Sequence, residues 1–379
     1  MKEGWEYKKL GEVATFINGF AFKPSQWVES GTPIIRIQNL NNPTAPYNYF
    51  NGEVPSKYVV KKGDVLISWS ASLGAYEWKG DKAYLNQHIF KVVFDKTDID
   101  KHFLKYAVTS KLTEMDKDAH GATMRHIVKT DFDNTKIPFP PLSEQQHIVE
   151  ELDLLSSIIE KKKAQLKELD NLAQSLFYEM FGDPITNEKG WEVKKMGEIG
   201  SVERGIGISK KDFVDNGLPC IHYGQIHTIF GPTTYKNKTF IPSDLLPKYK
   251  FAHPGDVIMA ITSEDVEGSC KSTAWLGNYD IVVGSDAAIF HHSINGVFIS
   301  YYTKTKAFYI EKAKYANGFK VTHISAKEIE SIPMPLPPLD LQYKFAESIE
   351  SIEHQKELIK QSIKEVETLF NSRMDDYFN

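Results

Sequence analysis

The sequence predicts an α+β protein built from two tandem copies of one unit, each a mixed α/β module followed by a long helix. Three observations lead to this prediction: the chain repeats itself, the repeated blocks contain short strand-like runs, and each copy closes with a heptad pattern. With 379 residues, 41% of them hydrophobic and 25% charged, the chain is typical of a soluble globular protein of two or three domains. This composition excludes a disordered chain, a collagen and a pure coiled coil.

The repeat is clearest at its opening, where GWEYKKLGE (4–12) returns as GWEVKKMGE (190–198) at an offset of 186. Three further blocks return in the same order: KKGDVLI (61–67) as HPGDVIM (253–259), HIF (88–90) as AIF (288–290) at an offset of 200, and FPPLSEQ (139–145) as LPPLDLQ (336–342). The offset drifts only by short, loop-sized insertions. Two copies are too few for a solenoid.

The first part of each unit has the pattern of a strongly bent sheet with a helix. Strand-like runs end in Gly, Pro or Asp. They are PIIRIQNL (33–40), DVLISWS (64–70) and HIFKVVF (88–94) in the first copy, and PCIHYGQI (219–226), DVIMAIT (256–262) and DAAIFHH (286–292) in the second. Helical spacing of apolar residues predicts a helix over 100–118 with Gly121 as its C-cap. Ser325 and Glu328 match a capping box just after the corresponding helix.

The second part of each unit is predicted to be a long helix. Apolar residues recur in steps of three and four after the prolines at 138–141 and again after those at 335–338. Each helix would have roughly 35 residues and a length of roughly 50 Å. We expect the two helices to pack antiparallel about a pseudo-two-fold axis, with a module at each end of the rod. The alternative is two surface helices, each packed on its own module.

The charge is divided unevenly along the chain. Residues 143–180 carry 8 acidic and 4 basic side chains, and residues 340–379 carry 9 and 5. Each helical segment therefore has a net charge of −4, and since the whole chain has −5, the modules together carry +3. Mildly basic modules are able to face phosphate, whereas acidic helices are poor partners for DNA.

The motifs of common catalytic sites are missing from the sequence. There is no GK dipeptide and so no P-loop, no GxGxxG, no HExxH and no NPPY-like tetrapeptide of an amino-methyltransferase. Two cysteines, Cys220 and Cys270, cannot form a disulfide framework or fill a zinc site alone, and they fit a reducing cytosol. The opening residues lack the apolar core of a signal peptide, and no apolar run approaches the length of a membrane span. We therefore expect a cytoplasmic protein without a catalytic site or a membrane segment.

These blocks resemble the specificity subunit (HsdS) of type I restriction-modification systems, over essentially the whole chain. The resemblance is carried by the two GWE openings, the two GDV strands and, above all, the two joints. The joints are GATMRHI…IPFPPLSEQQHIVEELD and NGFKVTHI…IPMPLPPLDLQYKFAESIE. One departure, Asp340-Leu341-Gln342 where the family pattern has Glu before Gln, concerns only a helix start.

The resemblance implies two target-recognition domains, at 1–142 and 183–338, each reading one half of a split site in double-stranded DNA. Spacer helices at 143–182 and 339–379 would form a coiled coil that fixes the half-site separation, on the order of 6–8 base pairs. The resemblance also implies that this chain performs no chemistry and holds no cofactor. Two HsdM adenine-N6 methyltransferase subunits would bring S-adenosylmethionine, and HsdR motor-nuclease subunits would bring ATP and Mg.

Base-reading side chains are expected where the two modules diverge, because RIQNL (36–40) faces HYGQI (222–226) and SWSAS (68–72) faces ITSED (261–265). Such side chains supply forked donors and acceptors to base edges. The candidates in the first module are Arg36, Gln38, Asn39, Ser68, Trp69, Ser70, Ser72, Asn86, Gln87, Arg125 and His126. Those in the second are His222, Tyr223, Gln225, Thr262, Ser263, Lys271, Lys320 and His323. Divergence at these positions predicts two different half-sites and an asymmetric site.

Each candidate has a structural alternative. Any one of them can instead be a solvated loop residue or part of a hydrogen-bonded turn, and Trp69 is equally compatible with the core. His126 and His323 repeat between the modules, which fits a backbone contact or a turn better than base reading. Methyltransferase contacts are expected on the helices at Leu155, Ile159, Ile352 and Ile359, although these residues can also simply hold the helices together.

Three other functions stay open at this point. The chain could serve a methyltransferase-only or fused restriction-modification complex, and its sequence would look the same. It could be a tandem scaffold that binds protein or glycan, with neutral or acidic module faces and no salt-dependent DNA binding. A cryptic nuclease would require metal-dependent cleavage by the purified chain alone.

Overall fold

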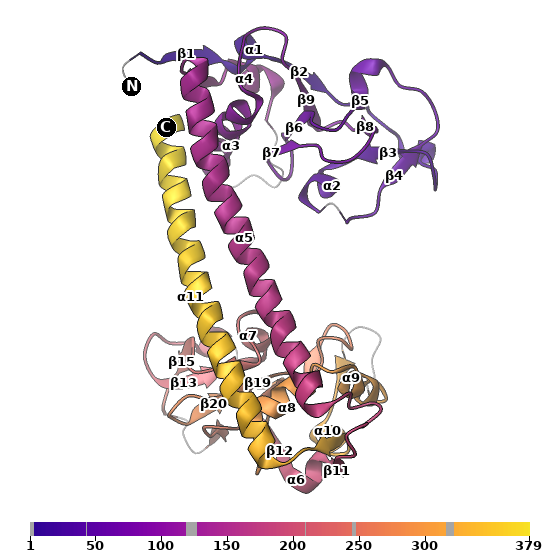
Figure 1. The fold of residues 1–379 in the computed structure, drawn as a ribbon, viewed down its shortest axis with the longest axis vertical. Coiled ribbons are helices and arrows are strands. Elements are labelled where there is room, and N and C mark those ends of the chain that lie inside the picture. The colour runs from indigo at the N-terminus through magenta and orange to yellow at the C-terminus, as the bar shows by residue number, and fades with distance from the viewer. Residues whose placement is uncertain (1–3, 43, 119–126, 209, 245–247, 316–321) are drawn as a thin grey trace. The chain divides into compact units, whose positions relative to one another are not determined.

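The computed structural model describes residues 4–42, 44–118, 127–208, 210–244, 248–315 and 322–379 (Figure 1). Its contacts divide the chain into two compact units, Met1–Lys163 with Gln361–Asn379, and Ala164–Lys360. Each unit therefore contains one module together with half of each long helix.

The described residues of the first unit form two four-stranded sheets and a two-stranded ribbon. The ribbon joins β1 (Glu6–Lys9) to β10 (Lys136–Phe139), and one sheet has the order β2 (Thr15–Asn18), β9 (Ile89–Val93), β6 (Val65–Ser68), β7 (Gly74–Glu77). The other sheet has the order β4 (Asn48–Phe50), β3 (Thr32–Ile35), β8 (Ala83–Leu85), β5 (Val59–Val60). Its helices are α1 (Leu10–Val13), α2 (Ile37–Asn41), α3 (Lys101–Asp118) and α4 (Lys129–Asn134).

The second unit repeats this arrangement with a five-stranded sheet. That sheet has the order β12 (Gly200–Arg204), β21 (Ala287–His292), β17 (Val257–Ala260), β19 (Lys271–Trp275), β14 (Thr233–Thr234). A four-stranded sheet has the order β15 (Thr239–Ile241), β13 (Leu218–Ile221), β20 (Ile281–Val283), β16 (Phe251–Ala252). In addition, β11 (Glu192–Lys195) pairs with β23 (Pro333–Leu336), and β18 (Thr262–Ser263) pairs with β22 (Thr322–His323). Its helices are α6 (Met196–Ile199), α7 (Tyr223–Thr228), α8 (Gly296–Tyr302), α9 (Lys306–Ala313) and α10 (Ala326–Glu330).

Three sequence predictions need correction. The alignment of SWSAS (68–72) with ITSED (261–265) is off by one residue, because Ser68 pairs with Ile89 and Ala260 with Ala287, which makes Ser68 and Ala260 equivalent. The runs 33–40 and 219–226 are strands only as far as Ile35 and Ile221, because α2 and α7 begin directly afterwards. The alignment of HIF with AIF at an offset of 200 is also wrong. Leu66 pairs with Lys91 while its counterpart Ile258 pairs with Ile289, so the correct offset at these strands is 198.

The other predicted elements are confirmed. The remaining runs contain β6, β9, β17 and β21, and the predicted helix over 100–118 is α3. The capping box begins α10, with the Ser325 backbone N–H donating to Glu328 Oε2 at 2.7 Å. Gly121, the predicted C-cap of α3, lies outside the described residues.

The repeated proline joint owes its geometry to a buried glutamine. Gln145 Oε1 accepts a hydrogen bond from the Asp100 backbone N–H at 2.9 Å, while its Nε2 donates to the Pro140 carbonyl at 2.9 Å. Gln342 repeats both contacts, with the Asn295 backbone N–H at 3.1 Å and the Pro337 carbonyl at 2.7 Å. Each glutamine therefore ties the start of a long helix to the start of a module helix, which explains why both joints end in Gln.

The long helices α5 (Leu142–Phe181) and α11 (Leu339–Phe378) have 40 residues each, somewhat more than the sequence predicts. They run antiparallel in both units (Figure 1). In the first unit Tyr377 donates to Glu151 and Lys163 lies 3.5 Å from Glu367. In the second unit Lys356 Nζ lies 2.8 Å from Asp170 Oδ1, and the rings of Phe177 and Phe345 are 5.7 Å apart. The helices are thus part of each module's core rather than an appendage.

Candidate nucleic-acid interface

Each module presents polar residues where two parallel strands end. In the first module β3 pairs in parallel with β8, so Arg36 and Asn86 follow the two strands at one edge, and the Asn86 backbone N–H donates to the Ile35 carbonyl at 3.2 Å. In the second module β13 pairs in parallel with β20, and His222 follows β13 at the same position. Both modules therefore have the same sheet edge, at the ends of β3 and β8 and of β13 and β20, but with different side chains on it.

Two of the predicted base readers, Asn39 and Gln225, are used inside the protein. Asn39 is 2% exposed, accepts from the Arg36 backbone N–H at 3.0 Å and donates to the Ala45 carbonyl at 3.2 Å. Gln225 is 8% exposed, accepts from the His222 backbone N–H at 2.9 Å and donates to Thr239 Oγ1 at 3.2 Å. Both amides cap the short helix that follows the strand, so neither is presented on the surface.

Arg36 and Gln38 are more accessible. The Arg36 guanidinium lies 5.2 Å from the Trp27 ring centroid and donates to Asn48 Oδ1 at 3.0 Å. Gln38 is exposed and donates to the Pro46 carbonyl at 3.2 Å. A guanidinium has five N–H donors, so one bond and a stacking contact orient it while leaving donors for a base edge.

The residues around the end of β6 are mixed. Ser68 is fully buried, and Trp69 lies in the core, stacked on Phe90 with ring centroids 5.4 Å apart. Of the two alternatives for Trp69, the structure therefore selects the core. Ser70, Ser72, Asn86 and Gln87 are half-buried in the connections at this edge.

In the second module the predicted residues gather around His227. The His227 Nε2 lies 3.1 Å from the Thr262 carbonyl, and Lys271 Nζ donates to the His227 carbonyl at 2.7 Å. Thr262 Oγ1 lies 3.1 Å from His323 Nδ1, and Ser263 is in the same two-residue strand, β18, that pairs with β22. Sequence reasoning missed His227, although its spacing of four from Tyr223 on α7 places both on one helix face.

His222 is the N-cap of α7, and its ring is held by a contact with the Tyr223 ring and by one hydrogen bond from the backbone. Its ring centroid is 4.6 Å from that of Tyr223, and its Nδ1 accepts from the Gly224 N–H at 3.1 Å. Burial is the main cause that lowers the pKa of His222, and the nearby charge of Lys210 lowers it further. A neutral ring at pH 7 is consistent with Nδ1 acting as an acceptor.

Asp286 is a second residue that sequence reasoning missed. It accepts from Thr262 Oγ1 at 3.2 Å, and Arg204 Nη2 lies 3.5 Å from it. Its backbone has φ 61°, and His88, at the equivalent position before the corresponding strand, has φ 73°. This left-handed turn is a repeated feature whose side chain differs between the modules.

A cavity of about 950 Å³ opens beside this cluster, entirely within the second unit. Hydroxyl, aromatic and lysine side chains line it, including Tyr223, Thr262, Ser263, Lys271, Lys304 and Lys312. A cavity beside the corresponding connection of the first module measures about 260 Å³ and includes Ser72 and Thr109. The two modules therefore offer unequal recesses at matching places.

Three predicted residues, Arg125, His126 and Lys320, lie outside the described residues. The predicted methyltransferase contacts lie in or near the helix packing: Leu155 and Ile159 are each 8% exposed, Ile352 is 6% exposed and Ile359 is half-buried. Apolar residues of the helices that do face outward include Leu154, Leu172, Leu358 and Leu369.

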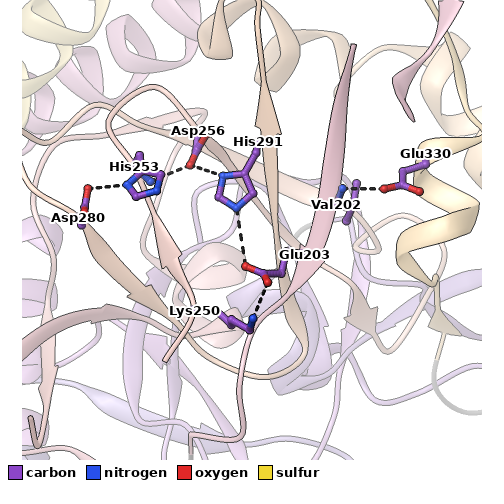
Figure 2. A network of polar contacts seen from close by, with 8 residues as sticks. All are labelled: Val202, Glu203, Lys250, His253, Asp256, Asp280, His291 and Glu330. Atoms are coloured by element: carbon purple, nitrogen blue, oxygen red, sulfur yellow. Dashed lines mark hydrogen bonds and ion pairs between the residues drawn. The ribbon is translucent and has the colours of Figure 1, made fainter. Parts of the chain in front are cut away.

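A separate polar network lies at the opposite end of β17 (Figure 2). Asp256 Oδ2 accepts from the His253 backbone N–H at 2.7 Å and lies 2.8 Å from His291 Nδ1. Lys250 Nζ lies 2.6 Å from Glu203 Oε1, and His253 Nδ1 lies 2.8 Å from Asp280 Oδ1. Within the described ranges, no three His, Cys, Asp or Glu side chains are arranged to hold a metal ion. We assign this network to holding the turn before β17.

No helix among the described residues combines the length and apolar character that a membrane span requires.

Comparison with known proteins agrees with this duplicated architecture. The family model of the type I restriction modification DNA specificity domain matches residues 2–170 and again 188–368. The chain is 24% identical to the type I restriction enzyme MjaVIII specificity subunit of Methanocaldococcus jannaschii, over 96% of this chain and 90% of that protein. It is 28% identical to the EcoBI specificity subunit of Escherichia coli, over 45% of this chain and 36% of that protein.

Solved structures share the fold. The type I restriction-modification S subunit of M. genitalium superposes with a TM-score of 0.54 at 14% identity, over 99% of this chain and 96% of that one. A chain from a structure concerned with complex assembly and conformational transition of the type I restriction-modification system gives a TM-score of 0.58 at 20% identity, over 99% and 97%.

The fold defines a protein with two copies of a DNA specificity domain on paired helices. The chain belongs to the family of type I restriction-modification DNA specificity subunits.

Proposed function

We propose that this chain is the sequence-specific recognition subunit of a type I restriction-modification enzyme, which reads an asymmetric, bipartite site in double-stranded DNA. The observation that carries the proposal is the repeated strand edge with unlike side chains. Arg36 and Asn86 occupy it in the first module, whereas His222 and Gly284 occupy the same positions in the second. Equal scaffolds with different donors and acceptors select different half-sites.

The long helices support the bipartite part of the proposal. A continuous helix of 40 residues is about 60 Å long, and both α5 and α11 contribute to both units. Two stiff helices in place of a flexible linker fix the separation of two bound half-sites. The recognised site would then be two short blocks at one fixed spacing.

The chemistry would reside in partner subunits. We propose that two HsdM adenine-N6 methyltransferase subunits bind this chain and bring S-adenosylmethionine, and that HsdR subunits bring ATP and Mg for DNA movement and cleavage. This chain would position them without a catalytic residue of its own, in the cytoplasm. Support comes from the sequence, which contains no P-loop and no NPPY-like motif.

The test is single-molecule mapping of methylated adenine in the host genome, with this gene intact and deleted. Loss of one split, asymmetric motif on deletion is the expected result, and it also supplies both half-sites and their spacing. If co-expression with the neighbouring methyltransferase produces no motif at all, the recognition proposal fails. Methylation without restriction of unmodified DNA would assign the chain to a methyltransferase-only complex.

A further inference from the structure

The two modules differ in the length of the connection that follows the central strand of the sheet. In the first module residues 69–73 join β6 to β7, whereas in the second residues 261–270 join β17 to β19. The strands on either side keep the same pairing, since Ser68 pairs with Gly74 and Ala260 with Lys271. The second module thus carries a five-residue insertion at one defined place, which we call the 261–270 loop.

The 261–270 loop has a folded shape. The Gly268 N–H donates to Asp265 Oδ1 at 2.7 Å, and Ser269 Oγ donates to the Val266 carbonyl at 2.8 Å. A Cβ added to Gly268 would come within 2.2 Å of Ser263 Oγ, so the turn is closely packed. Thr262 and Ser263 of this loop belong to the His227 cluster, and Glu264, Asp265 and Glu267 line the adjoining cavity.

A buried lysine ties this loop to the module. Lys312 on α9 is only 4% exposed, and its Nζ donates to the backbone carbonyls of Glu267 and Ser269. The ammonium also lies 5.9 Å and 5.7 Å from the rings of Phe308 and Tyr309. Burial is the main cause that lowers the pKa of Lys312, which reflects the free-energy cost of holding a charge there. A methionine would fill the same space without that cost, so packing alone does not account for a lysine at this position.

We propose that Lys312 is a positioning residue that holds the 261–270 loop in the shape with which the second module reads its half-site. This inference rests on the proposed function and deepens it. Lys312 fixes the backbone at two points of the loop, and so fixes where Thr262, Ser263 and Lys271 stand relative to the cavity. Contacts to base edges require such side chains to be held in place, because each base is discriminated by donor and acceptor geometry.

The test uses the complete complex, co-expressed with the neighbouring methyltransferase. The variant is Lys312→Met, and the matched control is Lys314→Met, an exposed lysine of the same region that pairs with Glu311 at 2.6 Å. Methylation is measured on duplexes that carry single-base changes in either half-site. Lys312→Met is expected to lower discrimination at the second module's half-site about tenfold, the scale of one lost base contact. Discrimination at the first half-site and the behaviour of the control should be unchanged.

A second variant guards against a folding defect. Deleting residues 264–268 together with Lys312→Met shortens the loop to the length found in the first module and removes the lysine that would be left unpaired. This variant should reproduce the selective loss at the second half-site while keeping full discrimination at the first. Unchanged discrimination at both half-sites in the Lys312→Met complex overturns the role of Lys312, whatever the deletion variant does. Equal loss at both half-sites also overturns it, because a general structural role would explain that result. A wild-type complex that methylates no split motif would instead overturn the proposed function.

Discussion

Asp64 in the first module and Asp256 in the second occupy the same position of a repeated turn, yet their charges are balanced differently. Each carboxylate accepts from the backbone N–H three residues earlier, at 2.8 Å and 2.7 Å. The partner of Asp64 is Lys91 at 3.0 Å, whereas that of Asp256 is His291 at 2.8 Å (Figure 2). The backbone of the repeat thus fixes the carboxylate, while the side chain that contacts it differs between the modules. At the sheet edge proposed to read DNA, too, the two modules share the backbone and differ in their side chains.

The largest effects should come from the aromatic anchors that the two modules share. The ring of Phe103 lies 5.3 Å from that of Phe378, and the ring of Phe298 stacks on Phe177 and meets Phe181 edge-on, in each case between a module helix and a long helix. Phe103→Ala and Phe298→Ala should each lower the free energy of unfolding of their own unit by about 3–5 kcal/mol. Hydrogen exchange resolved by segment measures this. Phe94→Ala, at an exposed position, is the control, and a loss shared equally by both units would contradict the division into two units.

The two aspartates provide a sharper comparison at pH 8. Asp64→Asn leaves the Lys91 ammonium half-buried without its carboxylate, which should cost about 1–3 kcal/mol. Asp256→Asn keeps an oxygen beside His291 Nδ1, so their hydrogen bond can be retained and we expect a loss of about 1 kcal/mol or less. Urea unfolding monitored separately in each unit gives both values. Equal losses would show that the identity of the partner does not matter.

Acid should weaken the second unit more than the first. Burial lowers the pKa of His292, whose counterpart in the first module is Phe94. Because the unfolded chain then takes up the proton more readily, the stability from His292 is present above pH 6.5 and is lost as the pH falls through the lowered pKa. His253 opposes this, since its hydrogen bond to Asp280 raises its pKa, but it is largely exposed.

The measurement is the pH dependence of unfolding of each unit between pH 8 and 5.5. His292→Phe should remove much of the acid loss from the second unit and leave the first unaffected. An unchanged pH dependence in that variant would assign the acid sensitivity to another group.

The smallest effect concerns the helix pair. Lys163 and Glu367 lie 3.5 Å apart with about half of each side chain exposed, whereas Lys356, bonded to Asp170, is largely buried. Lys163→Ala should change stability by less than about 0.5 kcal/mol, because solvent screens exposed pairs. Thermal unfolding at low and high salt checks this, and a loss above about 1 kcal/mol would give this pair a larger role.

The repeat and the heptads were enough to predict the modules and the two long helices, because both depend on apolar periodicity. The side-chain roles were harder. Asn39 and Gln225 have the residue types of adenine readers, but capping of α2 and α7 turns them inward. Strand pairing and a left-handed turn bring His227 and Asp286 to the cluster, and neither feature can be recognised in the local sequence. Because of small insertions, the sequence also did not show which residue of β21 in the second module corresponds to each residue of β9 in the first.

The discontinuity of the first unit bears on how the protein is made. Residues 164–360 form a continuous unit that is complete once they have left the ribosome, whereas the first module waits for residues 361–379. Phe370, Met374 and Phe378 pack into its core, so the module translated first lacks part of its apolar interior until those residues arrive. Folding during synthesis usually favours the segment nearest the amino terminus. Here the order is expected to reverse, because the first module cannot complete its core until residues 361–379 have been made.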